Sequence, residues 1–318
     1  MTTSTSPSTL AVRAESLVKV FGDNRAVDGV DLAVDAGTVY GVLGPNGAGK
    51  TTTINMLATL MRPDAGRAEI FGHDVSREPN VVRQLIGVTG QFASVDETLS
   101  ATENLMIFGR LLGLTCNEAK RKAGDLLERF SLTDAARRPL KKFSGGMRRR
   151  LDLAASLLAQ PPLIFLDEPT TGLDPRTRGQ MWDTIRELVA TGSTVLLTTQ
   201  YLDEADQLAD RIAVIDHGRV VAEGTADDLK ASVGTSSLIL RMSGTLSPEA
   251  ARITAPMSDP DRVTDLLITL REAGIHLTEM SVQKPTLDEV FLTITGRPAD
   301  AAATDSASAD AASEEVRA

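Results

Sequence analysis

The residues from Gly44 to Thr51 have the types and spacing needed to bind the phosphates of a nucleotide. The segment reads Gly44-Pro45-Asn46-Gly47-Ala48-Gly49-Lys50-Thr51 and matches every required position of a phosphate-binding loop. Glycines let backbone N–H groups curl around an anion, and a following helix adds its positive amino end. The apolar run Val39–Leu43 precedes the loop, and a helix is expected over Thr52–Leu60. We expect Lys50 to contact the β- and γ-phosphates and the Thr51 hydroxyl to bind Mg²⁺.

A second group of candidates follows the apolar run Leu163–Leu166, which ends in Asp167 and Glu168. Such a run is typical of a buried strand, and open α/β sheets bind ligands at the carboxyl ends of their strands. The two acids are therefore expected beside the phosphate loop. We expect Asp167 to hold Mg²⁺, largely through water, and Glu168 to act as a general base on the attacking water.

A third motif, Ser144-Gly145-Gly146-Met147, stands at the start of a helix expected from Met147 to about Ala159. A serine and two glycines at a helix amino terminus form another anion site. One chain has no evident use for two phosphate sites, so Ser144, Gly145 and Gly146 are interpreted as contacting the nucleotide held by another copy.

The elements that position these motifs indicate an α/β fold. Two amino-terminal strands are expected, Ala11–Val20 and Ala26–Val34, with turn residues after each. Short runs that are apolar on both faces suit a parallel sheet covered by helices. These runs are Val39–Leu43, Leu163–Leu166, Val195–Leu197 and Ile212–Ile215. Residues 94–160 have a helical pattern without a strand signal, and Ser100 and Glu103 form a capping box there.

The chain is expected to contain two domains between two tails. Residues 1–10 are expected to be a flexible tail, and residues 11–230 a nucleotide-binding domain whose helical subdomain spans about 94–160. Residues 236–297 have the pattern of a small α/β domain, and residues 298–318, rich in Ala, Asp, Ser and Glu, are expected to be disordered. The small domain is expected to contain Leu238–Met242, Pro260–Ala273, Ile275–Val282 and Asp288–Thr295.

Composition narrows the class of protein and its location. A formal charge of −10 and 3% aromatic residues argue against a nucleic-acid binder, since such binding depends on basic and stacking side chains. The single cysteine, Cys116, fits a reducing compartment. No apolar run reaches the ~18 residues that a membrane-spanning helix needs, and the start of the chain does not resemble a secretory signal. A cytoplasmic location is expected, with docking on a membrane through a partner.

The order of these motifs resembles the ATP-binding subunits of ABC transporters over roughly residues 11–230. The resemblance implies the P-loop NTPase fold of an ABC ATPase, with an amino-terminal antiparallel β subdomain, a helical subdomain carrying the signature and a small carboxy-terminal accessory domain. It also implies a homodimer in which two copies pair head to tail and sandwich two ATP molecules with Mg²⁺. Each ATP would lie between the phosphate loop of one copy, up to Thr52, and Ser144–Gly146 of the other.

The resemblance carries over four further residues. Gln91 stands at the position of the Q-loop glutamine, which implies contact with magnesium and with the membrane partner. Asp174 ends the D-loop Gly172-Leu173-Asp174. Phe21 falls where the family places an aromatic side chain that stacks on adenine, although packing in the core is an equally good interpretation. Gln200 stands where the family usually has a histidine; it can donate a hydrogen bond but cannot take up a proton near neutral pH.

Two segments, Gln200–Asp206 and Pro285–Phe291, resemble the drug-resistance branch of ABC exporters, the daunorubicin-resistance type. This implies an ATPase that powers efflux of a hydrophobic drug or antibiotic through a separate membrane (permease) subunit at the cytoplasmic face of the membrane. Two alternatives remain: a non-transport ABC ATPase and a slow nucleotide-binding regulatory module, which Gln200 would suit.

A basic cluster, Lys141, Lys142 and Arg148–Arg150, flanks the signature. It could attract nucleotide, or contact lipid headgroups or the membrane subunit. The alternative is a solvated helix face.

Overall fold

The structure is a computed structural model and describes residues 10–89, 95–233, 237–243, 252–256, 260–272, 276–283 and 285–296. These residues divide into two compact units. The main unit contains the described residues up to Glu223, and the second unit contains those from Gly224 onward. All the predicted nucleotide-binding motifs belong to the main unit.

The centre of the main unit is a six-stranded sheet in the order β10-β9-β3-β8-β7-β6. β3 pairs in parallel with β8 and β9, and β7 pairs in parallel with β6 and β8. The strands are β3 (Val39–Leu43), β6 (Ile86–Thr89), β7 (Leu163–Asp167), β8 (Thr194–Thr199), β9 (Arg211–Asp216) and β10 (Arg219–Gly224). Four of them match the predicted apolar runs, whereas β6 and β10 lack the buried run that would predict them.

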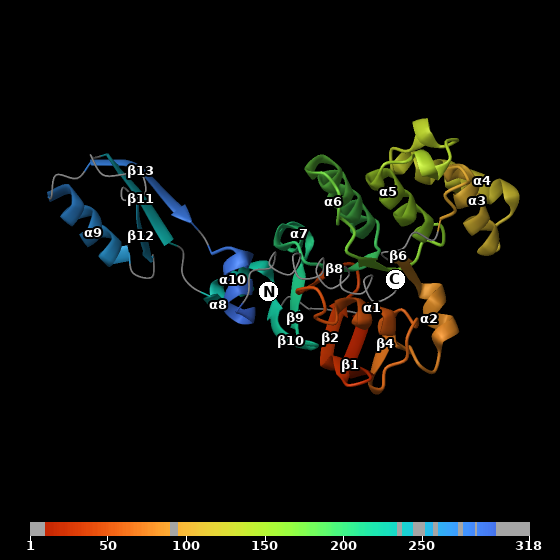
Figure 1. Cartoon of the computed structure of the whole chain (residues 1–318), viewed down its shortest axis with the longest axis horizontal. Coiled ribbons are helices and arrows are strands. Elements are labelled where there is room, and N and C mark those ends of the chain that lie inside the picture. Colours follow the sequence, from red (N-terminus) through yellow and green to blue (C-terminus); the bar gives the residue numbers. More distant parts are fainter. Residues whose placement is uncertain are drawn as a thin grey trace, which may run out of the picture. The chain divides into compact units, whose positions relative to one another are not determined.

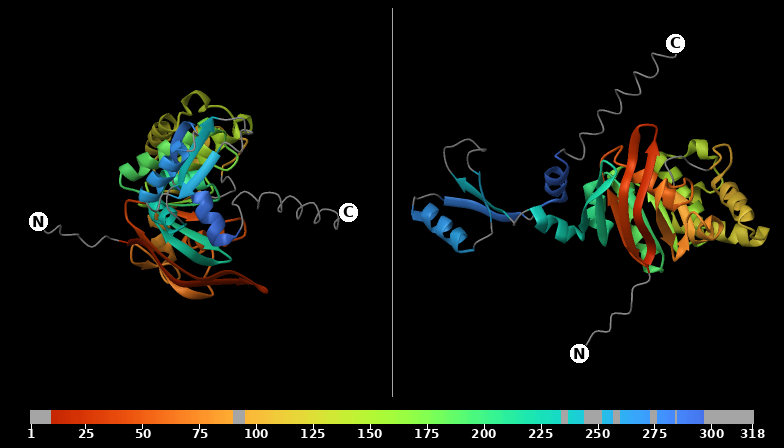
Figure 2. Two further views of the ribbon diagram at one scale, coloured as in Figure 1. Left: turned by 90° about the vertical axis from the view of Figure 1, so that its left-hand side faces the viewer. Right: turned by 90° about the horizontal axis from the view of Figure 1, so that it is seen from below.

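A second, antiparallel sheet has the order β2-β1-β4-β5, and its first two strands precede the phosphate loop while β4 and β5 follow it. β1 pairs with β2 on one side and with β4 on the other. The strands are β1 (Leu10–Phe21), β2 (Asn24–Asp35), β4 (Ala65–Ile70) and β5 (His73–Asp74). The long β1–β2 pair appears as the red ribbon in the right-hand view of Figure 2. The predicted amino-terminal strands and the antiparallel β subdomain are both confirmed.

Alternation along the central strands divides the main unit into two cores. On β7, Ile164 and Leu166 pack in one core while Leu163 and Phe165 pack in the other, as expected when successive side chains point to opposite faces. The first core contains helices α3 (Ala101–Leu111), α4 (Cys116–Arg129), α5 (Gly145–Ser156) and α6 (Pro175–Ala190). The second contains α1 (Lys50–Leu57) and the antiparallel sheet. Figure 1 shows these two layers on either side of the central sheet.

The predicted helical subdomain is built on α3, α4 and α5. The capping box at the start of α3 is present: Glu103 N–H donates to Ser100 Oγ at 3.3 Å, and Ser100 N–H donates to Glu103 Oε2 at 2.8 Å. A second capping box, Thr115 and Glu118, begins α4. Two short 3-10 helices, η1 (Thr133–Ala135) and η2 (Leu140–Lys142), lead to α5. The remaining helices of the main unit are α2 (Pro79–Leu85) and α7 (Leu202–Leu208).

The second unit contains α8 (Ala226–Val233) and a three-stranded antiparallel sheet in the order β12-β11-β13. The strands are β11 (Ser237–Ser243), β12 (Arg252–Pro256) and β13 (His276–Gln283), with α9 (Pro260–Glu272) between the last two. The helix α10 (Leu287–Thr295) buries Leu287, Val290 and Phe291. The predicted elements are present, and β12 is an addition.

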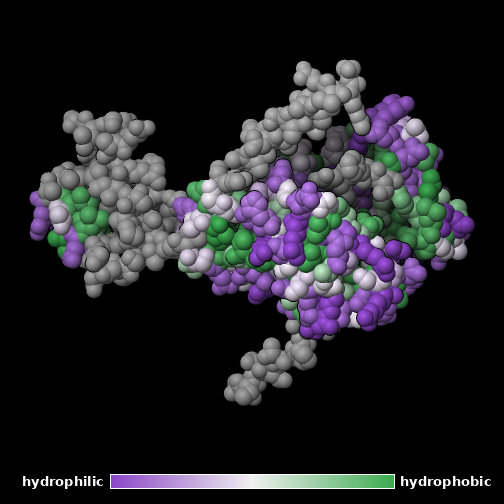
Figure 3. All heavy atoms as spheres, turned by 60° about the horizontal axis from the view of Figure 1, so that its bottom comes forward, coloured by the Kyte–Doolittle hydropathy of each residue, from purple (hydrophilic) through white to green (hydrophobic). Residues whose placement is uncertain are grey.

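The described surface mixes hydrophilic and hydrophobic residues on the face shown in Figure 3. Large exposed hydrophobic side chains include Leu111 on α3, which is 77% exposed, and Leu60, which is 67% exposed. In the described part of the chain, no helix combines the length and apolarity needed to span a bilayer.

Candidate active site

The phosphate loop connects β3 to α1, and two of its glycines have no room for a side chain. A Cβ on Gly44 would lie 2.3 Å from the carbonyl oxygen of Ile215. At Gly49, the residue before α1, φ is +105° and a Cβ would lie 2.4 Å from the carbonyl oxygen of Ala26. Because both contacts are with backbone, these positions require glycine.

Lys50 reaches back over the loop. Its Nζ donates to the carbonyl oxygens of Gly44 at 2.7 Å and Pro45 at 3.1 Å, and it lies 3.7 Å from Glu168 Oε1. The side chain is only 4% exposed, so burial lowers the pKa of Lys50, while the carboxylates of Glu168 and Asp167 raise it. The predicted phosphate-binding amine is thus held against the predicted catalytic acid.

Asp167 lies at the end of β7, against the first turn of α1. The Thr51 hydroxyl donates to its carboxylate at 3.0 and 3.2 Å, and the Thr198 hydroxyl, from β8, donates to the same group. Among the described residues there is no cluster of three His, Cys, Asp or Glu side chains that could hold a metal alone. Mg²⁺ is usually bound by one or two carboxylates together with waters and substrate phosphates. The hydroxyl of Thr51 and the carboxylate of Asp167 fit that donor set.

Glu168 follows in an unusual backbone conformation, with φ +48°. For a residue with a side chain this left-handed conformation costs of order 1–3 kcal/mol and persists only when neighbours enforce it. Its N–H donates to the Thr198 carbonyl oxygen at 3.1 Å. Its carboxylate accepts a hydrogen bond from the Thr171 hydroxyl at 3.2 Å. Hydrogen bonds therefore hold both the backbone and the carboxylate of Glu168.

Lys50, Thr51 and Glu168 line one cavity of about 720 Å³, whereas the buried Asp167 does not. Its lining includes most of the predicted residues: Phe21, Pro45, Asn46, Gly47, Ala48, Gly49, Lys50, Thr51, Thr52, Glu168 and Gln200. It also includes Asn24, Ala26 and Thr171, which the sequence did not single out. The Phe21 ring is 46% exposed at this cavity, which argues against the core-packing interpretation. Gly44 contributes its carbonyl oxygen to Lys50 instead.

The Ser-Gly-Gly motif begins α5, as predicted, and it does not line this cavity. Ser144 Oγ accepts a hydrogen bond from the Met147 N–H at 3.3 Å, so it caps the helix. Gly145 lines a neighbouring cavity of about 490 Å³. Glu168 and Thr171 line both cavities. The acid thus stands between the phosphate loop and the signature of its own chain.

Comparison with known proteins decides the family. Residues 27–171 match the family model described as ABC transporter. The chain is 54% identical to the daunorubicin/doxorubicin resistance ATP-binding protein of Streptomyces peucetius, over 94% of this chain and 96% of that protein. It is 46% identical to the doxorubicin resistance ATP-binding protein of Mycobacterium tuberculosis, over 92% and 95% of the two chains. The chain belongs to the ATP-binding subunits of ABC transporters.

Solved structures agree with this assignment. A structure described as the ATP-binding subunit of an ABC transporter has a TM-score of 0.63 and 30% identity, over 70% of this chain and 92% of that one. A dimeric ATP-binding cassette with bound ADP and Pi has a TM-score of 0.62 and 25% identity, over 67% and 98%. The predicted fold is confirmed, and the chain is an ABC-type ATPase, a nucleotide-binding enzyme coupled to transport.

Two further predicted site residues of this ABC ATPase are Asp174, which does not line the cavity, and Gln91. The Asp174 carboxylate accepts hydrogen bonds from the N–H of Thr177 at 3.0 Å and from its hydroxyl at 2.6 Å, and these bonds lower the pKa of Asp174. It therefore caps α6 in this structure. Gln91 lies outside the described residues.

The sequence missed three residues that hold the acids. Thr198 could have been found, because a hydroxyl residue at the carboxyl end of a buried strand faces the ligand edge of the sheet. Thr171 and Arg149 had no such signal. Arg149 contacts the backbone of Asp167, Glu168 and Pro169 only through the packing of α5 against this loop.

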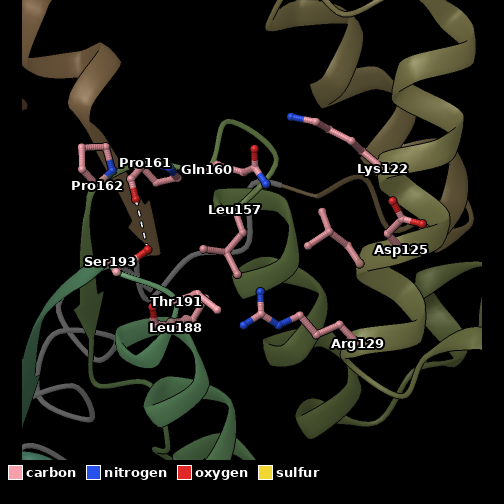
Figure 4. A pocket seen from close by; sticks show the side chains of 12 residues that line it. Lys122, Asp125, Arg129, Leu157, Gln160, Pro161, Pro162, Leu188, Thr191 and Ser193 are labelled. Carbon is pink, nitrogen blue, oxygen red and sulfur yellow. Dashed lines mark hydrogen bonds between the residues drawn. The ribbon is translucent and has the colours of Figure 1, made fainter. Parts of the chain in front are cut away.

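A further cavity of about 560 Å³ lies among α4, α6 and the loop before β7 (Figure 4). It is lined by Lys122, Arg129, Leu157, Leu188 and residues that immediately precede β7 and β8. These are the amino ends of the parallel strands, whereas α/β sheets bind ligands at the carboxyl ends. This cavity is therefore separate from the ATPase site.

Asp152 on α5 lines the cavity of about 490 Å³ that Gly145 and Glu168 also line. Burial raises the pKa of Asp152 from 3.8 to about 6, and Arg149 and Arg148 oppose that shift. Because the folded state binds this proton more tightly than the unfolded state, stability conferred by the protonated acid is lost as pH rises from about 4 to about 6.

We predict that Asp152→Asn weakens this pH dependence. The amide stays neutral, so the variant is expected to gain stability relative to the wild type as pH rises from 4.5 to 7, the two differing least at pH 4.5. Urea unfolding at both pH values measures the effect. Parallel pH profiles for the two proteins would contradict a raised pKa at Asp152.

Proposed function

We propose that two copies of this chain close head to tail around two ATP molecules with Mg²⁺ and drive a drug exporter. One observation carries the proposal. Lys50, Thr51, Asp167 and Glu168 converge at one edge of the sheet, while the signature of the same chain lies outside their cavity. A nucleotide bound by this loop would thus contact a signature motif only if another copy of the chain provides it. The dimeric relative with ADP and Pi supports this arrangement.

The contacts suggest how the residues act on ATP. Lys50 would exchange its partner Glu168 for the β- and γ-phosphates, which leaves the carboxylate available to polarise water. Thr51 and Asp167 would hold Mg²⁺, whose charge supports the negative charge that develops on the phosphates. Thr171 keeps Glu168 oriented by donating to its other oxygen.

Gln200 lines the cavity at the position where the family usually has a histidine. Its amide can donate a hydrogen bond to a phosphate oxygen but cannot accept a proton there. With Glu168 as the base, the role left for Gln200 is orientation. This is compatible with turnover, although a slow regulatory module remains the second candidate that this residue favours.

The transported substrate is proposed from the relatives. Those of Streptomyces peucetius and Mycobacterium tuberculosis are named for resistance to daunorubicin or doxorubicin, and one of Bacillus subtilis, 36% identical over 90% of this chain and 98% of that protein, for linearmycin resistance. We propose a hydrophobic antibiotic as the substrate. The pathway would lie in a separate membrane subunit, which would hold this chain at the cytoplasmic face of the membrane.

A groove of about 460 Å³ is the candidate contact for that membrane subunit. It runs between β6 and helices α3 and α5, and residues 90–94, which include Gln91, follow β6 directly. Its lining includes Val95, Phe108, Leu111 and Leu112, an apolar set of which Leu111 is 77% exposed. An exposed apolar groove of this kind suits an apolar helix end of the partner.

We predict that Leu111→Glu weakens co-purification with the membrane subunit without changing the ATPase rate of the isolated chain. A charge in this groove would have to be desolvated on docking. Leu60→Glu changes another exposed leucine, three residues after α1, and is the control that is expected to bind normally. Equal retention of both variants would rule out the groove.

We predict that Lys50→Ala weakens Mg-ATP binding by at least tenfold, since each lost charge-assisted bond to phosphate is worth about 1.5–3 kcal/mol. Equilibrium binding of Mg-ATP measures the change. An unaltered dissociation constant would contradict the role assigned to this loop.

We predict that Glu168→Gln traps a closed dimer in Mg-ATP but not in Mg-ADP, because the amide keeps the shape of the acid and cannot act as a base. Light scattering measures the mass, and phosphate release measures turnover. Wild-type turnover in this variant would contradict the base assignment. If no dimer forms, Gln200→His in the same background tests whether the phosphate contact at that position is too weak.

A further inference from the structure

Arg149 is the side chain that joins the signature helix to the loop of the catalytic acid. Its guanidinium donates to three successive carbonyl oxygens: those of Asp167, Glu168 at 2.8 Å and Pro169 at 3.2 Å. The planar fork of arginine suits several acceptors at once, which one ammonium group does not. Arg149 thus forms hydrogen bonds to the backbone on both sides of Glu168.

The Arg149 hydrogen bonds surround Glu168, the residue of the site with the strained backbone. Glu168 has φ +48°, and its N–H is held from β8 by Thr198 while its carbonyl oxygen is held from α5 by Arg149. A left-handed glutamate relaxes unless its surroundings enforce the conformation. Loss of the Arg149 bonds would free the carbonyl side of this turn and let the carboxylate swing away from its place opposite Lys50.

Arg149 is also tied to the signature through its own helix. It lies five residues after Ser144, about 7–8 Å further along the axis of α5. A helix moves as a rigid rod over this length. Any shift of Ser144–Gly146 would therefore reach the carbonyl oxygens around Glu168.

The electrostatic surroundings favour this placement. Burial lowers the pKa of Arg149, and the nearby carboxylates of Asp152, Asp167, Glu168 and Glu204 raise it. The guanidinium stays charged throughout the accessible pH range. Its neighbour Arg150 makes different contacts, donating to the carbonyl oxygen of Phe130 at 3.1 Å in the helical subdomain. The two arginines therefore provide a matched comparison on one helix.

We infer that Arg149 is a positioning residue for hydrolysis, which holds the turn of Glu168 in its own chain against the helix that carries the signature. The inference rests on the proposed role of Glu168 as base and on the proposed head-to-tail dimer. It assigns part of the basic cluster beside the signature to the acid of the same chain, and not to attraction of nucleotide or lipid.

The first test separates catalysis from binding. Arg149→Met is expected to lower kcat about 10- to 100-fold, the usual cost of misplacing a catalytic group by about an ångström, and to leave the Kd for Mg-ADP within about threefold. Arg149→Lys is expected to recover part of kcat, because an ammonium can still bond one or two of the carbonyls. Arg150→Gln is the control, with kcat expected within about twofold of the wild type.

The second test asks which acid Arg149 serves. Differently tagged copies are mixed in Mg-ATP and purified through both tags, with Glu168→Gln in one copy so that only the other copy can hydrolyse. Arg149→Met is then placed either in the copy with the intact Glu168 or in the copy with Glu168→Gln. Phosphate release in a single turnover is expected to be lost in the first arrangement and kept in the second.

The outcomes distinguish a failure of the Arg149 assignment from a failure of the proposed dimer. Loss in the second arrangement alone would mean that Arg149 acts through the signature on the other chain's nucleotide, which would overturn the assignment. Unchanged kcat in Arg149→Met, or an equal loss in Arg150→Gln, would overturn it too. If the control mixture without any Arg149 substitution forms no dimer in Mg-ATP, even with Gln200→His in both copies, the proposed sandwich itself fails and the assignment fails with it. If Arg149→Met does not fold, Arg149→Lys is placed in the same two arrangements.

Discussion

The parallel register of β3, β8 and β7 is the constraint on which the rest of the site depends. Leu43 pairs with Thr199, and Asp167 pairs with Thr198, so three strands end at one level. The phosphate loop and the two acids enter the same space because of this alignment. A slip of one residue would exchange the two faces of a buried strand and separate the acids from the loop. The apolar side chains on both faces, packed in two cores, prevent that slip.

Much of this arrangement can be predicted from sequence because the signals are local. A glycine-rich turn after an apolar run, and two acids at the end of another, each fix the end of a strand. β6 and β10 could not be predicted, since one has four residues and the other alternates exposed and half-buried positions. Arg149 and Thr171 were likewise not identifiable as supports for Glu168, because their contacts depend on how distant segments pack. The division of the chain at residue 230 and the roles of individual site residues stay predictions.

The charged groups of the site have partners within the chain. The buried amine of Lys50 has Glu168 at 3.7 Å, and the hydroxyls of Thr51 and Thr198 both donate to Asp167. Exchange of the Glu168 carboxylate for phosphate oxygens would keep the buried amine of Lys50 compensated, which lowers the cost of binding the nucleotide.

The position of the signature outside its own cavity has a further consequence for how activity depends on amount. If each chain provides only half of every reaction chamber, the rate at low abundance rises with the square of the number of chains. A membrane subunit that binds two copies would then raise their effective concentration, so that their association no longer depends on diffusion. Chains in excess of such sites would consume little ATP, so energy expenditure would follow the number of exporters assembled.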